Sequence, residues 1–182
     1  MGRLILVTGG ARSGKSSFAE GYAKNTGLPV TYLATSRIAD EEMRARIDHH
    51  RAQRPAHWST LEADTRPGET LSGARGAVLL DCITMLVANL MVDENVNWDQ
   101  HTDEDDERCQ RAVDAQIESL ITASRKEDIT LIVVTNELGM GLVPVYPFGR
   151  VFRDVAGRAN QRLAAAADEA YLLVSGIAVK LR

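Results

Sequence analysis

The sequence has 182 residues, of which 45% are hydrophobic and 5% aromatic, a length and composition that suit one soluble domain with a full core. The net charge of −4 argues against a nucleic-acid groove or an anionic membrane surface as the main partner. No apolar run approaches the length of a membrane span, and no signal-peptide core precedes the first apolar run. Cys82 and Cys109 form no metal pattern, so we interpret them as reduced thiols of a cytoplasmic protein.

A complete phosphate-binding motif lies near the start of the chain. An apolar run of strand length, residues 4–8, leads into GGARSGKS at 9–16, and apolar residues at helical spacing follow. In such a loop the glycines let backbone N–H groups converge on phosphate oxygens, the lysine reaches the outer phosphates, and the last serine ligates Mg²⁺. The alternative is a glycine-rich turn with a chance lysine. The position of the motif between a strand and a helix favours a nucleoside triphosphate site. Its predicted members are Gly9, Gly10, Ala11, Arg12, Ser13, Gly14, Lys15 and Ser16.

Two adjacent histidines lie on a helix that is predicted to begin near Asp40 and to end before Pro55. Met43, Ile47 and His50 lie on one face of that helix, at spacings of four and then three residues. This favours a packed or hydrogen-bonded role for His50. His49 lies about 100° away around the helix and is therefore the more accessible imidazole.

A buried strand at 77–81 ends in Asp81. An acid that closes an apolar strand is the usual form of the second magnesium ligand in nucleoside triphosphate enzymes. An aspartate at a strand end can also be a simple turn or helix cap. Downstream of a full phosphate loop, we favour the metal role for Asp81.

The other predicted elements alternate between strands and helices. Strands are expected at 30–34 and 130–135, helices at 83–91, 107–124 and 150–167, and an antiparallel hairpin at 170–174 and 177–181. Residues 59–62 are predicted to form a short strand or a loop, and residues 63–75 a weak helix or loop. Residues 93–107 are predicted to be a solvated acidic excursion, and residues 143–149 a connecting loop. The polar side chains of the last helix could contact phosphate or a neighbouring subunit, but their spacing alone favours a solvated face with i,i+4 pairs. The fold prediction is an α/β domain over 1–182, with a mostly parallel sheet flanked by helices and an antiparallel strand at its end.

A polar loop, 136–141, follows the strand at 130–135. Because the carboxyl ends of parallel strands line the ligand crevice of an open sheet, this loop is expected at the same edge as the phosphate loop.

Taken together, these stretches resemble the bifunctional adenosylcobinamide kinase / adenosylcobinamide-phosphate guanylyltransferase family of cobalamin biosynthesis. The likeness covers nearly the whole chain. It rests on LVTGGARSGKS at 6–16, YLATS at 32–36, DEEMRARIDHHRAQRPAHW at 40–58, LLDCIT at 79–84, VVTNELGMGLVP at 133–144 and FRDVAGRANQRLAAAADEAYLLVSGIAVKL at 152–181.

The resemblance implies two reactions in sequence. ATP or GTP donates its γ-phosphate to adenosylcobinamide, and a histidine then takes GMP from GTP and passes it to adenosylcobinamide phosphate. By the family pattern the nucleophile is His49, with Lys15 acting on the phosphates and Mg²⁺ held by Ser16 and Asp81. Further nucleotide contacts are implied at Ala34, Thr35, Ser36, His50, Arg51, Ala52, Gln53, Glu62 and Asp81. The family also implies a RecA-like P-loop sheet and a homotrimer, with no nucleic-acid partner.

Two segments depart from the family pattern. Where the family usually has a polar stretch containing Glu-Asn, this chain has Val145-Tyr146-Pro147-Phe148, and the acidic segment 93–107 has no family role.

Overall fold

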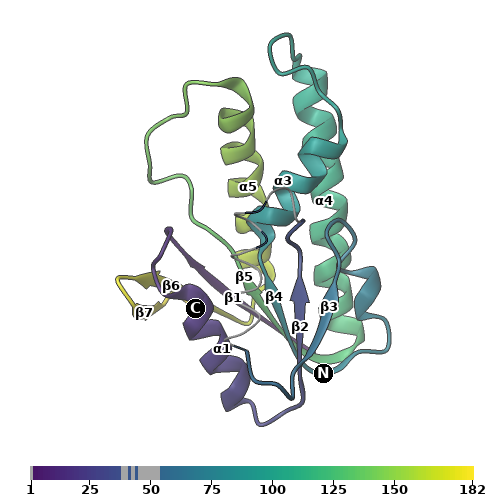
Figure 1. The fold of residues 1–182 in the computed structure, drawn as a ribbon, viewed down its shortest axis with the longest axis vertical. Coiled ribbons are helices and arrows are strands. Elements are labelled where there is room, and N and C mark those ends of the chain that lie inside the picture. Colours follow the sequence, from purple (N-terminus) through teal and green to yellow (C-terminus); the bar gives the residue numbers. More distant parts are fainter. Residues whose placement is uncertain (1, 38–40, 42–43, 45–53) are drawn as a thin grey trace.

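The structure, a computed structural model, describes residues 2–37, 41, 44 and 54–182. Its strands form one seven-stranded sheet in the order β3-β2-β4-β5-β1-β6-β7 (Figure 1). The neighbouring strands pair in parallel except for β6 and β7, which are antiparallel. The strands are β1 (Arg3–Gly9), β2 (Val30–Ala34), β3 (Ser59–Glu62), β4 (Arg75–Asp81), β5 (Asp128–Val134), β6 (Glu169–Val174) and β7 (Ile177–Lys180). This confirms the predicted mostly parallel sheet and its antiparallel end.

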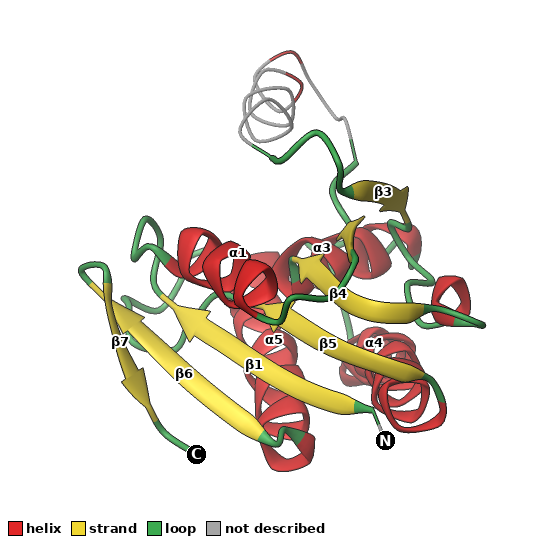
Figure 2. Cartoon of the chain, turned by 90° about the horizontal axis from the view of Figure 1, so that it is seen from below, coloured by secondary structure: helices red, strands yellow, loops and turns green. Residues whose placement is uncertain are grey.

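Helices cover both faces of the sheet. Figure 2 shows α1 on one side and α4 and α5 on the other. In the described part of the chain the helices are α1 (Lys15–Asn25), α3 (Ile83–Asp93), α4 (Asp103–Lys126) and α5 (Pro147–Ala166), with a 3-10 turn at Glu69–Leu71. None of them is long and apolar enough to cross a membrane.

The central strands are apolar throughout because both of their faces are buried. On β5, Leu131 and Val133 pack in the core beneath α3, α4 and α5, whereas Ile132 and Val134 pack in the core beneath α1. Each of these four side chains is fully buried. A continuous apolar run is what such a two-sided strand requires, since alternate residues point to opposite faces.

The register of the sheet brings the carboxyl ends of its strands to one edge. Val7 of β1 is opposite Val134 of β5, and Val134 is in turn opposite Asp81 of β4. Asp81 is also opposite Ala34 of β2. The phosphate loop, the residues after β2 and the Asp81 carboxylate therefore meet at this edge, where ligands bind in open α/β sheets.

Two helices begin earlier than predicted. Helix α4 starts at Asp103 instead of 107, because Thr102 caps it in a reciprocal capping box with Asp105. The acids of its first turn face the positive end of the helix dipole, so part of the acidic segment is helical and not a loop. Helix α5 starts at Pro147 instead of 150, with proline in the first turn, where its missing N–H is not needed.

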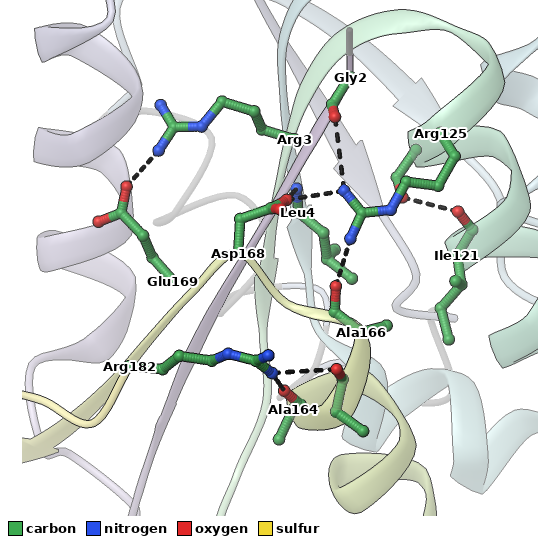
Figure 3. A network of polar contacts seen from close by, with 12 residues as sticks. Gly2, Arg3, Leu4, Ile121, Arg125, Ala164, Ala166, Asp168, Glu169 and Arg182 are labelled. Atoms are coloured by element: carbon green, nitrogen blue, oxygen red, sulfur yellow. Dashed lines mark hydrogen bonds and ion pairs between the residues drawn. The ribbon is translucent and has the colours of Figure 1, made fainter.

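Polar contacts tie the chain together at the edge opposite the phosphate loop (Figure 3). Asp168, which precedes β6, accepts hydrogen bonds at 2.8 Å from the Leu4 N–H and from the Arg125 guanidinium. Arg125 also donates to the carbonyl of Ala166. These contacts join β1, α4 and the end of α5.

The carboxylate of the neighbouring Glu169 accepts hydrogen bonds from several side chains. It accepts from the hydroxyl of Tyr171 at 2.5 Å, from Lys180 at 3.2 Å and from Tyr22 at 3.0 Å, and Arg3 pairs with it. The hydrogen bonds from Tyr171, Lys180 and Tyr22, that from Tyr171 first, lower the pKa of Glu169 from 4.5 to about 2.

We expect Glu169→Gln to lower the free energy of unfolding at pH 7 by about 1–2 kcal/mol. A depressed carboxylate pKa stabilises the fold above the unfolded value of 4.5, and this stabilisation is lost as the pH falls from there to about 2. Urea unfolding at pH 7 and at pH 3 measures the difference. An equal gap between wild type and variant at both pH values would contradict the expectation.

Candidate functional site

The phosphate loop is held against the hairpin of β6 and β7. A Cβ atom at Gly9 would lie 2.6 Å from the carbonyl oxygen of Leu173, so only glycine fits there. The N–H of Gly176, in the hairpin turn, donates to the carbonyl of Ser13 at 2.9 Å. Gly14 has a φ of 91° in the left-handed region that favours glycine. The hairpin thus supports the loop from outside.

Helix α1 begins at Lys15 with its N-terminal N–H groups free of side-chain caps. Gly14 provides no capping side chain, and the first turn contains no acid. Helix α4, by contrast, has both a capping box and four acids in its first turn. An uncapped helix start after a glycine-rich loop attracts anions through its N–H groups and its dipole.

Lys15 is the buried cation of this loop. Its side chain is nearly buried, 9% exposed, and Nζ donates to the carbonyl of Gly10 at 3.0 Å. The ammonium group is therefore folded back over the loop that it would serve, at hydrogen-bond distance from a backbone oxygen. A single carbonyl is a weak partner for an ammonium, which leaves Lys15 two further donors for phosphate oxygens.

Ser16 and Asp81 offer oxygen ligands at the same sheet edge. Ser16 is half-buried in the first turn of α1, and Asp81 is half-buried at the end of β4. No cluster of three or more His, Cys, Asp or Glu side chains that could hold a metal occurs among the described residues. The hydroxyl of Ser16 and the carboxylate of Asp81 are suitable oxygen ligands for Mg²⁺ that arrives with a nucleotide, because phosphates and water would supply its other ligands.

Tyr32 fixes the Asp81 carboxylate. The buried hydroxyl of Tyr32 donates to Asp81 Oδ2 at 3.1 Å, and the guanidinium of Arg54 stacks on the Tyr32 ring, 3.3 Å from its centroid. Burial and the negative charge of Asp81 raise the pKa of Tyr32 well above its usual value, so the hydroxyl stays a donor. One carboxylate oxygen is thus occupied and oriented by the protein.

We expect Tyr32→Phe to weaken Mg²⁺-dependent nucleotide binding about tenfold, because partners that orient a metal ligand typically contribute this much to metal affinity. The phenylalanine ring preserves the stacking surface for Arg54. Titrating Mg²⁺ against a fluorescent nucleotide bound to the protein measures the effect. The control is Tyr22→Phe, whose hydroxyl contacts Glu169 and not Asp81. Equal Mg²⁺ titrations for both variants would contradict the role given to Tyr32.

Thr35 joins β2 to β4 just beyond the strand ends. Its hydroxyl donates to the Cys82 carbonyl at 2.7 Å and accepts from the Cys82 N–H at 2.9 Å, and its own carbonyl accepts from Asn89 at 2.7 Å. The side chain is fully buried. Thr35 therefore braces the edge, because both its hydroxyl and its backbone carbonyl are already hydrogen-bonded within the protein.

The other residues predicted to contact nucleotide are only partly placed. Ala34 and Ser36 flank Thr35 and are half-buried, and Glu62 is exposed at the end of β3, opposite Ala34. His49, His50, Arg51, Ala52 and Gln53 lie outside the described residues, and Arg54 follows them directly.

A polar network at the end of β5 escaped the sequence analysis. The Asn136 side chain donates to the Thr84 hydroxyl at 2.8 Å, and the Asn160 side chain donates to the Asn136 carbonyl at 3.0 Å. Thr135 donates to Asn160 Oδ1 at 2.7 Å. The solvated face assigned to the last helix is thus wrong for Asn160, which is 8% exposed. A polar residue on a polar helix carries no sequence signal of such burial.

The ion pairs of Arg162 differ from the i,i+4 pairs expected within the last helix. Arg162 pairs with Asp114 and with Glu118 of α4, each at 2.8 Å. These contacts link two helices instead of successive turns of the same one.

The strand order and the loop together define the class of protein. Strand β5 lies between β1, which carries the phosphate loop, and β4, which ends in Asp81, as expected for a RecA-like P-loop sheet. A prototypical ATPase from the type III secretion system of pathogenic bacteria is similar, with a TM-score of 0.58 at 11% identity over 99% of this chain and 57% of that chain. The type III secretion ATPase EscN of enteropathogenic E. coli gives a TM-score of 0.56 at 12% identity over 96% of this chain and 43% of its own. At these identities the likeness shows the fold alone, and the chain spans about half the length of those ATPases.

Within this class, the chain belongs to the cobinamide kinase / cobinamide phosphate guanyltransferase family, whose model matches residues 5–181. Relatives named bifunctional adenosylcobalamin biosynthesis protein CobU are 47% identical in Escherichia coli K12 and 48% identical in Salmonella typhimurium LT2, each covering 98% of this chain and 99% of its own. The bifunctional adenosylcobalamin biosynthesis protein CobP of Pseudomonas aeruginosa PAO1 is 36% identical over 97% of this chain and 96% of its own. The family predicted from the sequence is confirmed.

Proposed function

We propose that this protein phosphorylates adenosylcobinamide with a nucleoside triphosphate and then transfers GMP from GTP, through a guanylylated His49, to give adenosylcobinamide-GDP. The observation that carries the proposal is the intact phosphate loop within a chain that matches the family over residues 5–181. We propose one domain for both reactions, in a homotrimer.

The kinase step depends on neutralising charge around the γ-phosphate. The N–H groups of the loop and of the first turn of α1 hold the phosphate chain, and Lys15 offsets the charge that spreads over the transferring group. Ser16 and Asp81 would hold Mg²⁺, which supplies further positive charge when bound.

The guanylyl transfer needs a nucleophile, and a histidine is suited to it. A neutral imidazole nitrogen is nucleophilic at physiological pH. In the first half-reaction it bonds to the α-phosphorus as pyrophosphate leaves. In the second, the phosphate of the corrinoid displaces the histidine, and the nucleotidyl group moves on.

Labelling with ATP that carries radioactive γ-phosphate tests the kinase assignment against an ATPase or a nucleotide-switched binding protein. With adenosylcobinamide and Mg²⁺ present, we expect the label to appear stoichiometrically in the corrinoid. Release of inorganic phosphate alone, at a rate that adenosylcobinamide does not change, would favour the ATPase or the switch. Chromatography of the corrinoid fraction decides between them.

A further inference from the structure

Glu137 lies directly beside the phosphate loop although it comes from a different strand. It is the second residue of the loop after β5, and its N–H donates to the carbonyl of Gly9 at 3.1 Å. The preceding Thr135 bonds in the same way to Val7, at 3.0 Å. The backbone hydrogen bond places Glu137 beside Gly9, the first residue of the phosphate loop. Because β5 lies between β1 and β4, Glu137 is on the side of the loop that faces the end of β4, where Asp81 lies.

A cavity of about 540 Å³ opens beside Glu137, between β1 and α5. It is lined on the sheet side by Thr8, the residue before the phosphate loop, and on the helix side by Arg153 and Gln161. The volume is in the range that small organic ligands occupy. The cavity thus begins where the phosphate loop begins, on the face of the sheet opposite to α1.

Three polar residues of the cavity, Thr8, Arg153 and Glu137, have unused hydrogen-bonding capacity. Thr8 is 9% exposed, and its Oγ1 has no partner among the described residues. Within the described residues, Asp154 is the one ion-pair partner of Arg153, at a long distance of 3.9 Å. Glu137 Oε1 accepts from the N–H of Gly139 at 3.0 Å, and in the described part of the chain Oε2 makes no hydrogen bond or ion pair. A half-buried carboxylate with a free oxygen is therefore available to a donor in the cavity.

We infer that this cavity takes the hydroxyl-bearing arm of the acceptor alcohol and that Glu137 is the general base of the phosphoryl transfer. The inference rests on the proposed kinase function. The acceptor oxygen forms a bond to the γ-phosphorus, and the bond from that phosphorus to the β,γ-bridging oxygen breaks. Glu137 takes the hydroxyl proton, and the nucleoside diphosphate leaves with the bridging electron pair. A positioned carboxylate is the group that accepts the substrate hydroxyl proton in other kinases.

The other carboxylates at this edge are less suited to the same task. Asp81 is oriented by Tyr32 and placed for Mg²⁺, and its strand is separated from β1 by β5. Glu62 is exposed at the end of β3, at the far side of the sheet from β1. Among the described acids at the strand ends, only Glu137 is bonded through its backbone to the phosphate loop.

The test is Glu137→Gln, which keeps the size of the side chain and an acceptor for the Gly139 N–H. We expect kcat for corrinoid phosphorylation to fall 100-fold or more, and the limb of the pH–rate profile that falls toward acid to disappear, because the base is gone. Nucleotide binding and labelling of the protein by α-labelled GTP are expected to stay within about twofold of wild type. The matched control is Glu20→Gln on α1, for which we expect an unchanged kcat.

Three results would overturn the inference. One is a kcat within threefold of wild type in Glu137→Gln. Another is a parallel loss of nucleotide binding in that variant, which would make Glu137 a structural part of the loop. The third is wild-type protein that makes no phosphorylated corrinoid, which would overturn the proposed kinase function as well, whereas the first two leave that function standing.

Discussion

Replacement of Lys15 by alanine is expected to lower corrinoid phosphorylation by a factor of about 100–1,000. Lys15 is the buried cation of the phosphate loop, and its Nζ already lies 3.0 Å from the Gly10 carbonyl oxygen. Removing one preorganised donor at a site of developing negative charge typically costs a factor of 100–1,000. Lys15 also binds the ground-state phosphates, so nucleotide affinity is expected to fall too. Initial rates with labelled ATP, with calorimetric titration of the nucleotide, measure both effects.

Lys24→Ala is the control for this variant. Lys24 lies in the last turn of the same helix, exposed and 5.8 Å from the ring of Trp58. Its removal changes the net charge by the same amount but leaves the phosphate loop intact, so its rate should match wild type. Similar activities for Lys15→Ala and Lys24→Ala would show that the loop does not bind the reacting nucleotide.

Replacement of His49 by alanine is expected to abolish covalent labelling of the protein by GTP carrying radioactive α-phosphate, while corrinoid phosphorylation continues. The bond in question is a phosphoramidate, so the label on the wild-type protein should be lost in acid and kept in base. Gel autoradiography after each treatment reads this out. His57→Ala, which alters an exposed histidine beyond Arg54, is the control and should label like wild type.

Label that survives in His49→Ala, or no acid-labile label on the wild-type protein, would contradict the guanylyltransferase proposal. The remaining function would then be a kinase alone, with His49 an ordinary residue of the chain.

The sheet was predictable because its apolar runs are short and complete. The run at 130–135 is buried on both faces, and the run at 77–81 ends in the acid that closes β4. The starts of α4 and α5 were not found, since the deciding signals were the capping pair of Thr102 and Asp105 and the proline at position 147. Such signals are weaker than periodicity, and acids in a run are more easily interpreted as a solvated loop.

Only part of the candidate site could be predicted from sequence. The phosphate loop is local in the chain, so its spacing alone identifies Lys15 and Ser16. The Asp81 carboxylate is oriented by a hydrogen bond from Tyr32 on a neighbouring strand. The Glu137 N–H donates to the carbonyl of Gly9, more than a hundred residues away in the chain. Contacts of this kind depend on strand order, which the sequence pattern left open.

The most direct test of the account is to incubate the wild-type protein with adenosylcobinamide, ATP, GTP and Mg²⁺ and to follow the corrinoid by mass spectrometry. We expect the mass to rise first by one phosphate and then by one GMP, so that adenosylcobinamide phosphate appears before adenosylcobinamide-GDP. A corrinoid whose mass stays unchanged while ATP or GTP is consumed would contradict it.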